Sequence, residues 1–262
     1  MNKKQIFLGV FVPMLMLSCA SKHYQIVGIE RTRVIVDSRY DEHPDESAAR
    51  FIAPYKRVND SIMGPVVGAV AHNMHPDRPE SDLSNLVSDI LVWAAKDYNE
   101  SPVLGIYNMG GIRADLTKGD VTYGDVLDIA PFENKICFVT LTGEQMMDLF
   151  RQIARRGGEG VSRGTELVIT KSGELLSARL HGQEIDPKAD YRVATINYLI
   201  EGNDGMPALG QGRDIVAPGE ASNNTRFLIM NYFREKLACG EVVDSKIEGR
   251  IIVKRDKWGS TE

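Results

Sequence analysis

The 262-residue chain contains few cysteines, and its charge shows no basic excess. Three cysteines are too few for the disulfide framework of a small secreted scaffold. The 31 basic residues are outnumbered by 36 acidic ones. This balance argues against a general nucleic-acid binder, because such a protein needs a basic face. The hydrophobic fraction of 43% is that of a globular protein and excludes disorder over most of the length.

Only one long apolar run is present, at residues 6–17, and it is too short to span a bilayer as a helix. It follows two lysines, which is the pattern of a secretory signal. The residues that end at Cys19, Leu-Met-Leu-Ser-Cys, resemble a bacterial lipobox. The alternative is a plain signal peptide with an incidental cysteine. We expect residues 1–18 to be a lipoprotein-type signal peptide and Cys19 to be the lipidated mature N-terminus. The protein would then be lipid-anchored in a bacterial envelope, facing the periplasm or the exterior.

The other two cysteines lie in different patterns. Cys137 belongs to an apolar strand pattern, and Cys239 ends a helical one. An oxidising compartment permits a disulfide, but two cysteines do not define one. We favour two buried free thiols, and whether they pair stays open.

Apolar periodicity predicts helices and strands that alternate without a strict βαβ rhythm, which favours an α+β fold. We expect a single domain at 24–253, a mixed β-sheet flanked by helices, and a loose tail at 254–262. Gly119 and Asp120 are expected to form a turn. The predicted helices are 48–63, with Pro54 as a break or kink, 80–98, 123–129, 143–156 and 225–238. The predicted strands are 33–36, 103–107, 135–141, 167–170, 176–180, 191–196 and 251–253.

A glycine-rich turn, Asn-Met-Gly-Gly-Ile-Arg at 108–113, follows one predicted strand. Gly110 and Gly111 allow positive φ and a close approach to a ligand. Asn108 and Arg113 stand on either side of the turn and can aim their donors at one bound group. The alternative is a surface turn with a solvated arginine.

Two further loops carry residues suited to a planar, hydroxylated ligand. Phe132 lies in a turn, where an exposed ring can stack on a planar group, although a phenylalanine more often caps the core. Tyr198 follows a strand, and Asp204 lies in a loop between glycines. A carboxylate accepts two hydroxyl hydrogen bonds from a sugar diol. A simple turn is the alternative for this loop.

No metal site or catalytic residue is predicted. His72 and His75 are the only histidines that lie close together in the sequence, and no further ligand follows the usual patterns. No Ser-His-Asp or Cys-His arrangement is legible from spacing.

Together these segments resemble the C-terminal, substrate-binding domain of the 5′-nucleotidase family, which includes UDP-sugar hydrolases and 2′,3′-cyclic phosphodiesterases. The match also includes the segment that begins at Glu80. The order and number of the motifs make it more specific than any one of them. In chain order they are Asn-x-Gly-Gly-Ile-Arg, Gly-Asp-Val-Thr-Tyr-Gly-Asp-Val-Leu, Pro-Phe-x-Asn, Leu-Thr-Gly, Tyr-Arg-Val-Ala-Thr and Gly-x-Asp-Gly.

The resemblance assigns a role to each matching residue. It implies that Phe132 and Tyr198 sandwich a nucleobase. It implies that Arg113 and Asp204 hold the ribose hydroxyls and that Asn108 contacts the base or the sugar. The family usually has phenylalanine at the tyrosine position, so the hydroxyl alters the edge of the pocket.

The remaining matches concern the backbone and one more cation. Gly110 and Gly111 match the family's turn, and Arg78 matches an upstream arginine. Asn203 stands where the family frequently has a glycine. Asparagine is tolerated at a loop position with positive φ.

Full-length members of the family also have a metallophosphatase domain that holds two metal ions, and this chain shows no match to it. We expect no cofactor in this chain and divalent metals only in a partner. The interpretation we favour is a nucleoside- or nucleotide-recognition subunit of a split 5′-nucleotidase, inactive alone, with a separate metallophosphatase subunit. The alternative is a non-catalytic nucleotide-binding surface lipoprotein. The sequence does not specify the base, because aromatic stacking accepts every base.

Overall fold

The computed structural model describes residues 24–42 and 44–255, and the chain divides into two units, 1–51 and 52–262. The described part of the first unit is extended to Asp37 and then forms the short 3-10 helix η1 (Ser38–Tyr40). The strand predicted at 33–36 is wrong. A β-strand requires a hydrogen-bonded neighbour, and these residues pair with no strand in the described part of the chain. The predicted signal peptide and Cys19 lie outside the described residues.

Helix α2 (Glu46–Met63) confirms the helix predicted at 48–63 and starts two residues earlier. Pro54 lies inside it, so a break there is wrong, while the alternative of a kink stays a prediction. A proline removes one backbone donor, and that loss does not end this helix. None of the helices in residues 24–42 and 44–255 combines the length and hydrophobicity that a bilayer crossing requires.

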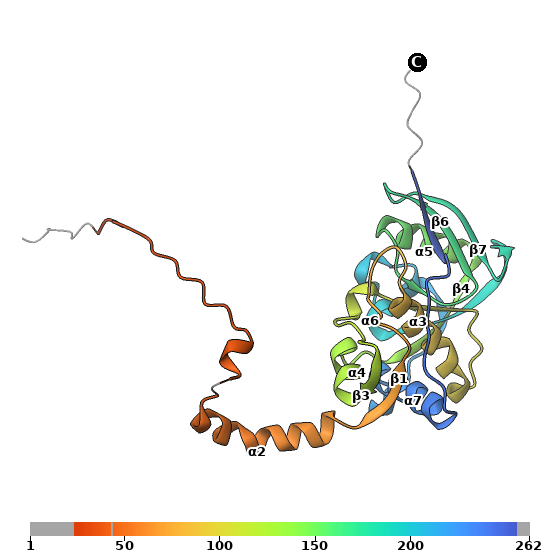
Figure 1. Ribbon diagram of the computed structural model, residues 1–262. Coiled ribbons are helices and arrows are strands. Elements are labelled where there is room, and N and C mark those ends of the chain that lie inside the picture. The colour runs from red at the N-terminus through yellow and green to blue at the C-terminus, as the bar shows by residue number, and fades with distance from the viewer. Residues whose placement is uncertain (1–23, 43, 256–262) are drawn as a thin grey trace, which may run out of the picture. The chain divides into compact units, whose positions relative to one another are not determined.

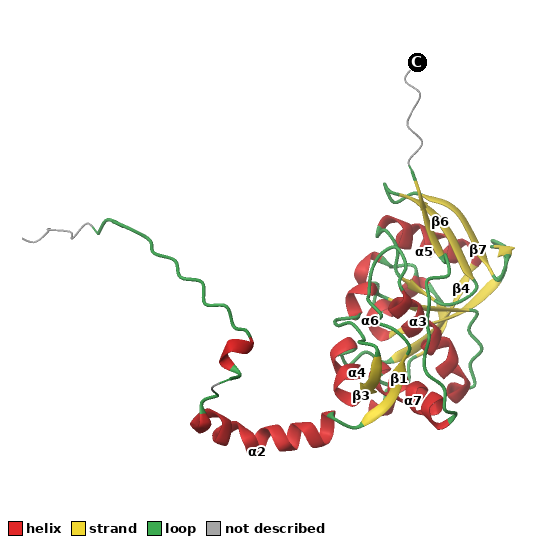
Figure 2. Ribbon diagram, viewed as in Figure 1, coloured by secondary structure: helices red, strands yellow, loops and turns green. Residues whose placement is uncertain are grey.

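The second unit contains three β-sheets with helices packed on them (Figures 1 and 2). The largest has the strand order β10-β4-β9-β2-β5, in which β2 is parallel to β9 and the other pairs are antiparallel. A second sheet has the order β11-β6-β7-β8, with β11 parallel to β6. The third pairs β1 with β3. The α+β class with mixed sheets is therefore confirmed. The strands are β1 (Val66–Val70), β2 (Leu104–Tyr107), β3 (Gly119–Thr122), β4 (Ile136–Thr142), β5 (Gly160–Val161), β6 (Thr165–Thr170), β7 (Leu175–Leu180), β8 (Gln183–Glu184), β9 (Asp190–Ile196), β10 (Arg213–Val216) and β11 (Ile251–Lys254).

Four helices of this unit, α3, α4, α5 and α7, begin at side-chain caps and bury apolar residues. Ser81 and Ser84 form a reciprocal capping box at the start of α3, and Thr142 does the same with Gln145 at α5. The apolar face predicted for α3 is buried throughout, from Leu83 to Ala94. The α-helices are α3 (Asp82–Ala94), α4 (Tyr123–Ile129), α5 (Gly143–Arg155), α6 (Asn197–Ile200) and α7 (Thr225–Ala238). Short 3-10 helices are η2 (Ala95–Tyr98), η3 (Met109–Gly111), η4 (Asn203–Gly205), η5 (Leu209–Gln211) and η6 (Ala221–Asn223).

Three local predictions need correction. The turn expected at Gly119 and Asp120 is the start of strand β3, which pairs with β1. Cys239 is exposed, because it follows the last turn of α7 on the solvent side, whereas Cys137 is buried as predicted. Both thiols are free. The tail predicted from residue 254 begins inside β11, and residues 256–262 lie outside the described part.

The strand pairing brings three loops to one edge of the largest sheet. Strands β2 and β9 run parallel, so their carboxyl ends lie together. Strand β4 runs antiparallel to β9, with Ile136 opposite Ile196, so β4 begins at the same edge. Asn197 joins two of these loops, because its side-chain oxygen accepts from the N–H of Lys135 at 2.8 Å. This edge collects the segments that carry the predicted binding residues.

Candidate functional site

A cavity of about 390 Å³ lies at this edge of the sheet. It has the size of a small-ligand site. Seven of its lining residues are those expected from the sequence, and Asn134 is an addition. The lining consists of Asn108, Gly110, Gly111, Arg113, Phe132, Asn134, Tyr198 and Asp204.

Asp204 is the acidic centre of this cavity. Its Oδ2 accepts from Asn108 Nδ2 at 2.6 Å, and its Oδ1 accepts from the Tyr198 hydroxyl at 3.4 Å. Asn108 is buried directly after β2, which fixes the position of its amide. The positive φ that was expected at Asn203 occurs instead at the next residue, Asp204, whose φ is 53°. Asn203 instead ties the loop down, because its Nδ2 donates to the Tyr198 carbonyl at 2.9 Å.

Phe132 and Arg113 form another part of the wall. The Phe132 side chain is 46% exposed, so the ring is available at the surface rather than lost in the core. The guanidinium carbon of Arg113 lies 6.0 Å from the centre of that ring, at the outer limit of a cation–π contact. Arg113 also donates to the Gly110 carbonyl at 3.3 Å. An exposed ring with an adjacent cation suits a planar ligand that carries an anionic or hydroxylated group.

The glycine-rich turn is the short helix η3. Neither Gly110 nor Gly111 has positive φ, so that part of the expectation is wrong. The expected close approach to a ligand stays a prediction. What the structure shows at Gly111 is close packing inside the protein: a Cβ there would lie 2.7 Å from Asn108 Oδ1 and 2.9 Å from a ring carbon of Tyr107. At Gly110 the nearest atoms would be 3.9 Å away. The second glycine is therefore required by the packing of the turn, and the first is not.

A buried carboxylate holds this turn from behind. Glu159 is 1% exposed, and its Oε2 accepts from the backbone N–H of Met109 at 2.5 Å. Its Oε1 accepts from Arg78 Nη2 at 2.5 Å and from Arg156 Nε. Arg156 extends from there towards the cavity, with Nη2 3.8 Å from Asp204 Oδ2. Arg78 itself does not line the cavity.

The acidic centre changes the titration of two neighbours. The charge of Asp204, with a contribution from partial burial, raises the pKa of the Tyr198 hydroxyl above its usual value. Burial disfavours the charged form of Arg156, but hydrogen bonding to Glu159 and the charges of Glu159 and Asp204 raise its pKa overall. At neutral pH the tyrosine is therefore a neutral donor and the arginine a cation.

The histidine pair does not form a metal centre. His72 lies 3.2 Å from both Asp82 and Asp244, while His75 Nδ1 lies 2.8 Å from Asp115. Each ring therefore has its own carboxylates. Among the described residues, no group of three or more histidine, cysteine, aspartate or glutamate side chains is placed to hold a metal.

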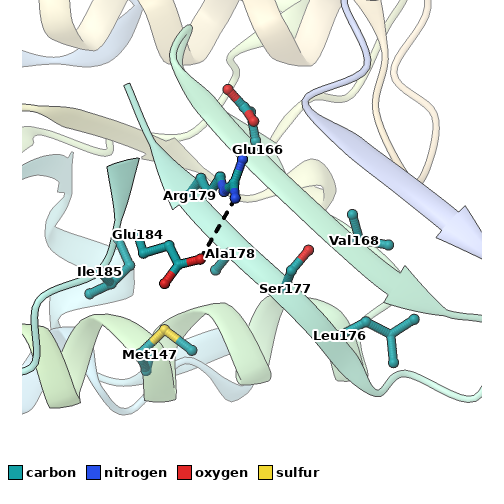
Figure 3. A pocket seen from close by; sticks show the side chains of 9 residues that line it. All are labelled: Met147, Glu166, Val168, Leu176, Ser177, Ala178, Arg179, Glu184 and Ile185. Carbon is teal, nitrogen blue, oxygen red and sulfur yellow. Dashed lines mark ion pairs between the residues drawn. The ribbon is translucent and has the colours of Figure 1, made fainter. Parts of the chain in front are cut away.

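A second cavity of about 460 Å³ lies along β6, β7 and β8 and contains none of the predicted residues (Figure 3). Arg179 and Glu184 form an ion pair there at 3.6 Å. Met147 contributes to the lining from helix α5, which lies beside these strands in Figure 3. The charged groups that line it are of both signs. The first cavity is the better candidate because its aromatic and polar groups converge.

The fold is an α+β domain with a small-ligand cavity at one edge of its largest sheet. A family model described as 5′-nucleotidase, C-terminal domain, matches residues 66–211, and the chain belongs to that family. The "Silent protein UshA(0)" of Salmonella typhimurium is 24% identical over 81% of this chain and 38% of its own length. The "Trifunctional nucleotide phosphoesterase protein YfkN" of Bacillus subtilis is 29% identical over 80% of this chain and 15% of its own length.

Solved structures show the same fold. The 5′-nucleotidase precursor of Thermus thermophilus superimposes with a TM-score of 0.69 at 24% identity, over 82% of this chain and 44% of that one. The NAD nucleotidase of Haemophilus influenzae gives 0.57 at 19% identity, over 81% and 42%. The chain thus spans less than half the length of these relatives.

Three residues of the site escaped the sequence analysis. Asn134 belongs to the Pro-Phe-x-Asn motif, and the sequence pattern assigns it no role. Arg156 caps the end of α5, and Glu159 follows a glycine pair just before β5, where no pattern sets either residue apart from a surface charge. A glutamate in an otherwise Gly-rich segment is a weak signal, and only its burial reveals it.

Proposed function

We propose that this chain is the nucleoside- or nucleotide-recognition subunit of a split 5′-nucleotidase. The observation that carries the proposal is the single cavity in which Phe132, Tyr198 and Asp204 meet. Two aromatic side chains suit a base, because every nucleobase has a stacking face. The carboxylate suits sugar hydroxyls, which need an acceptor. Arg113 lies at the exposed side and would hold the sugar or an adjoining anionic group.

The hydrolytic step belongs, in this proposal, to a separate metallophosphatase. The chain spans less than half the length of these relatives, and the proposal assigns the hydrolytic chemistry to the part that it does not match. The partner would supply the divalent metals, which stabilise charge on a transferring phosphate. This chain would contribute by holding the base and sugar so that the phosphate faces those metals.

Titration calorimetry with adenosine and AMP tests the recognition role. We expect both to bind, and we expect Phe132→Ala and Asp204→Ala each to weaken binding at least fivefold. One stacked base contributes roughly 1–3 kcal/mol, and a hydrogen bond to a charged group contributes roughly 1.5–3 kcal/mol. The matched control is Leu176→Ala in the second cavity, where the side chain has nearly the same exposure of 45%. No binding by the folded wild type, or equal loss in the control, contradicts the proposal.

Co-purification from envelope extract tests the partner role. A tagged chain should retain a metallophosphatase and acquire AMP hydrolysis. EDTA should then abolish hydrolysis while adenosine binding by this chain persists, because the metals are in the partner. Binding without any such partner would leave a nucleotide-binding surface protein.

The proposed location is the bacterial envelope, with a lipid on Cys19 as the anchor. Cys19→Ala should move the protein from the membrane fraction to the soluble fraction and abolish labelling with a radioactive fatty acid. Retention in the membrane fraction would contradict the anchor.

A further inference from the structure

The carboxylate of Asp204 already has a protein donor on each oxygen. Asn108 donates to Oδ2 at 2.6 Å, and the Tyr198 hydroxyl donates to Oδ1 at 3.4 Å. All three residues line the same cavity. The Asp204 side chain is 22% exposed, so the carboxylate also faces the space where a ligand would lie. A ligand hydroxyl that donates to Oδ1 would therefore bind an oxygen that already accepts a hydrogen bond from Tyr198 in the free protein.

The two protein donors differ in how easily their hydrogen bonds to Asp204 can be broken. Asn108 is 4% exposed, and its short bond keeps the amide on Oδ2. The Tyr198 bond is long, which makes it weak. A phenolic hydrogen also rotates about its C–O bond at little cost. Each oxygen has a second acceptor position, so a ligand hydroxyl can bond to Oδ1 either beside the tyrosine or in its place, whereas Oδ2 keeps its amide.

A site that hydrogen-bonds a hydroxyl usually rejects a ligand without it, because a polar group of the site is then left unpaired. Here the tyrosine remains on Oδ1 when the ligand lacks that hydroxyl. We infer that Tyr198 is a specificity-determining residue that relaxes sugar selection, so that the site accepts deoxyribonucleosides as well as ribonucleosides. The inference rests on the proposed nucleoside-binding function and adds the substrate class.

The test measures the dissociation constants of adenosine, 2′-deoxyadenosine and 3′-deoxyadenosine by calorimetry. For the wild type we expect all three within about tenfold, since one hydrogen bond contributes little when its loss leaves nothing unpaired. For Tyr198→Phe we expect the ratio of deoxyadenosine to adenosine constants to rise about fivefold for at least one of the two deoxynucleosides. That nucleoside lacks the hydroxyl that pairs with Oδ1.

The matched control is Tyr123→Phe, which removes a hydroxyl from a partly buried tyrosine of α4 outside the cavity. Its ratios should equal those of the wild type. Circular dichroism and the thermal midpoint establish that both variants fold. The wild-type ratios provide a second measurement that needs no variant.

The outcomes separate the two proposals. Wild-type discrimination above tenfold, or unchanged ratios in Tyr198→Phe, overturns the inference and leaves nucleoside recognition intact. If the folded wild type binds none of the three nucleosides, the proposed function fails and the inference fails with it.

Discussion

The carboxylate of Glu159 accepts a hydrogen bond from the backbone N–H of Met109, 50 residues earlier in the chain, at 2.5 Å. This bond fixes the turn that follows β2. Because the other oxygen of the same carboxylate binds Arg78 and Arg156, one buried residue links the turn, two cations and the surroundings of Asp204. The cavity is thus supported from behind by a group that does not line it.

Glu159→Gln should destabilise the protein strongly. The substitution removes the anion that faces the partly exposed cations of Arg78 and Arg156 and weakens the acceptor of the buried Met109 N–H. Leaving a buried donor unsatisfied costs roughly 1–3 kcal/mol. Chemical denaturation should show a loss of unfolding free energy in that range, together with weaker adenosine binding. The control is Asp148→Asn, which breaks an exposed pair with Arg151 and should cost less than about 1 kcal/mol. An equal loss of unfolding free energy in the two variants would mean that the contacts of Glu159 stabilise the protein no more than an exposed ion pair does.

The two glycines of the turn should respond differently to alanine. Gly111→Ala places a methyl group 2.7 Å from Asn108 Oδ1, so the turn or the amide must move, and we expect adenosine binding to fall at least tenfold. Gly110→Ala meets no atom closer than 3.9 Å and should leave the fold unchanged. Calorimetry measures the adenosine affinity of the two variants, and their thermal midpoints measure fold stability. Similar behaviour in both would contradict this account of the turn.

The two described thiols should differ in reactivity. Burial, followed by the charge of Glu201, raises the pKa of the Cys137 thiol to about 11. It therefore stays protonated and shielded at pH 8, whereas Cys239 is exposed. With Cys19→Ser as the background, a disulfide reagent should label one thiol in the native protein and two in denaturant. Adding Cys239→Ser should abolish native labelling, and residual rapid labelling would contradict the burial of Cys137.

Glu248 should contribute stability that is lost in acid. Burial raises the pKa of its carboxyl, but hydrogen bonds from Arg250 and Arg163 outweigh this and hold it below the ordinary value of 4.5. A depressed pKa in the folded state stabilises the protein above the unfolded-state pKa and ceases to do so as pH falls through the folded-state value. Arg250 is 3% exposed and depends on this anion and on Asp89.

We therefore expect Glu248→Gln to lower the free energy of unfolding at pH 7, and we expect the difference from wild type to shrink steadily below about pH 4.5. Urea unfolding at a series of pH values measures this. Glu133→Gln, at an exposed carboxylate, is the control and should show little difference at any pH. A difference that does not change with pH would contradict the titration of Glu248.

Local pattern was sufficient for the elements that bury one face. The apolar spacing of α3 and the caps at Ser81 and Thr142 are short-range features, so the predicted helices formed where expected. The two-residue strands β5 and β8 are too short to leave an apolar pattern and exist through their partners, and strand β1 was also not predicted. The predicted strand at 33–36 failed for the same reason: β propensity without a neighbour does not make a strand.

The candidate residues of the cavity could be named from the sequence, because Phe132, Tyr198 and Asp204 lie in motifs whose order resembles the 5′-nucleotidase family. Their meeting in one cavity follows from the parallel pairing of β2 with β9 and the antiparallel pairing of β4, which no local pattern specifies. The role of Glu159 depends on folding in the same way. A carboxylate on a loop is a solvated surface charge until the fold removes it from water and surrounds it with donors.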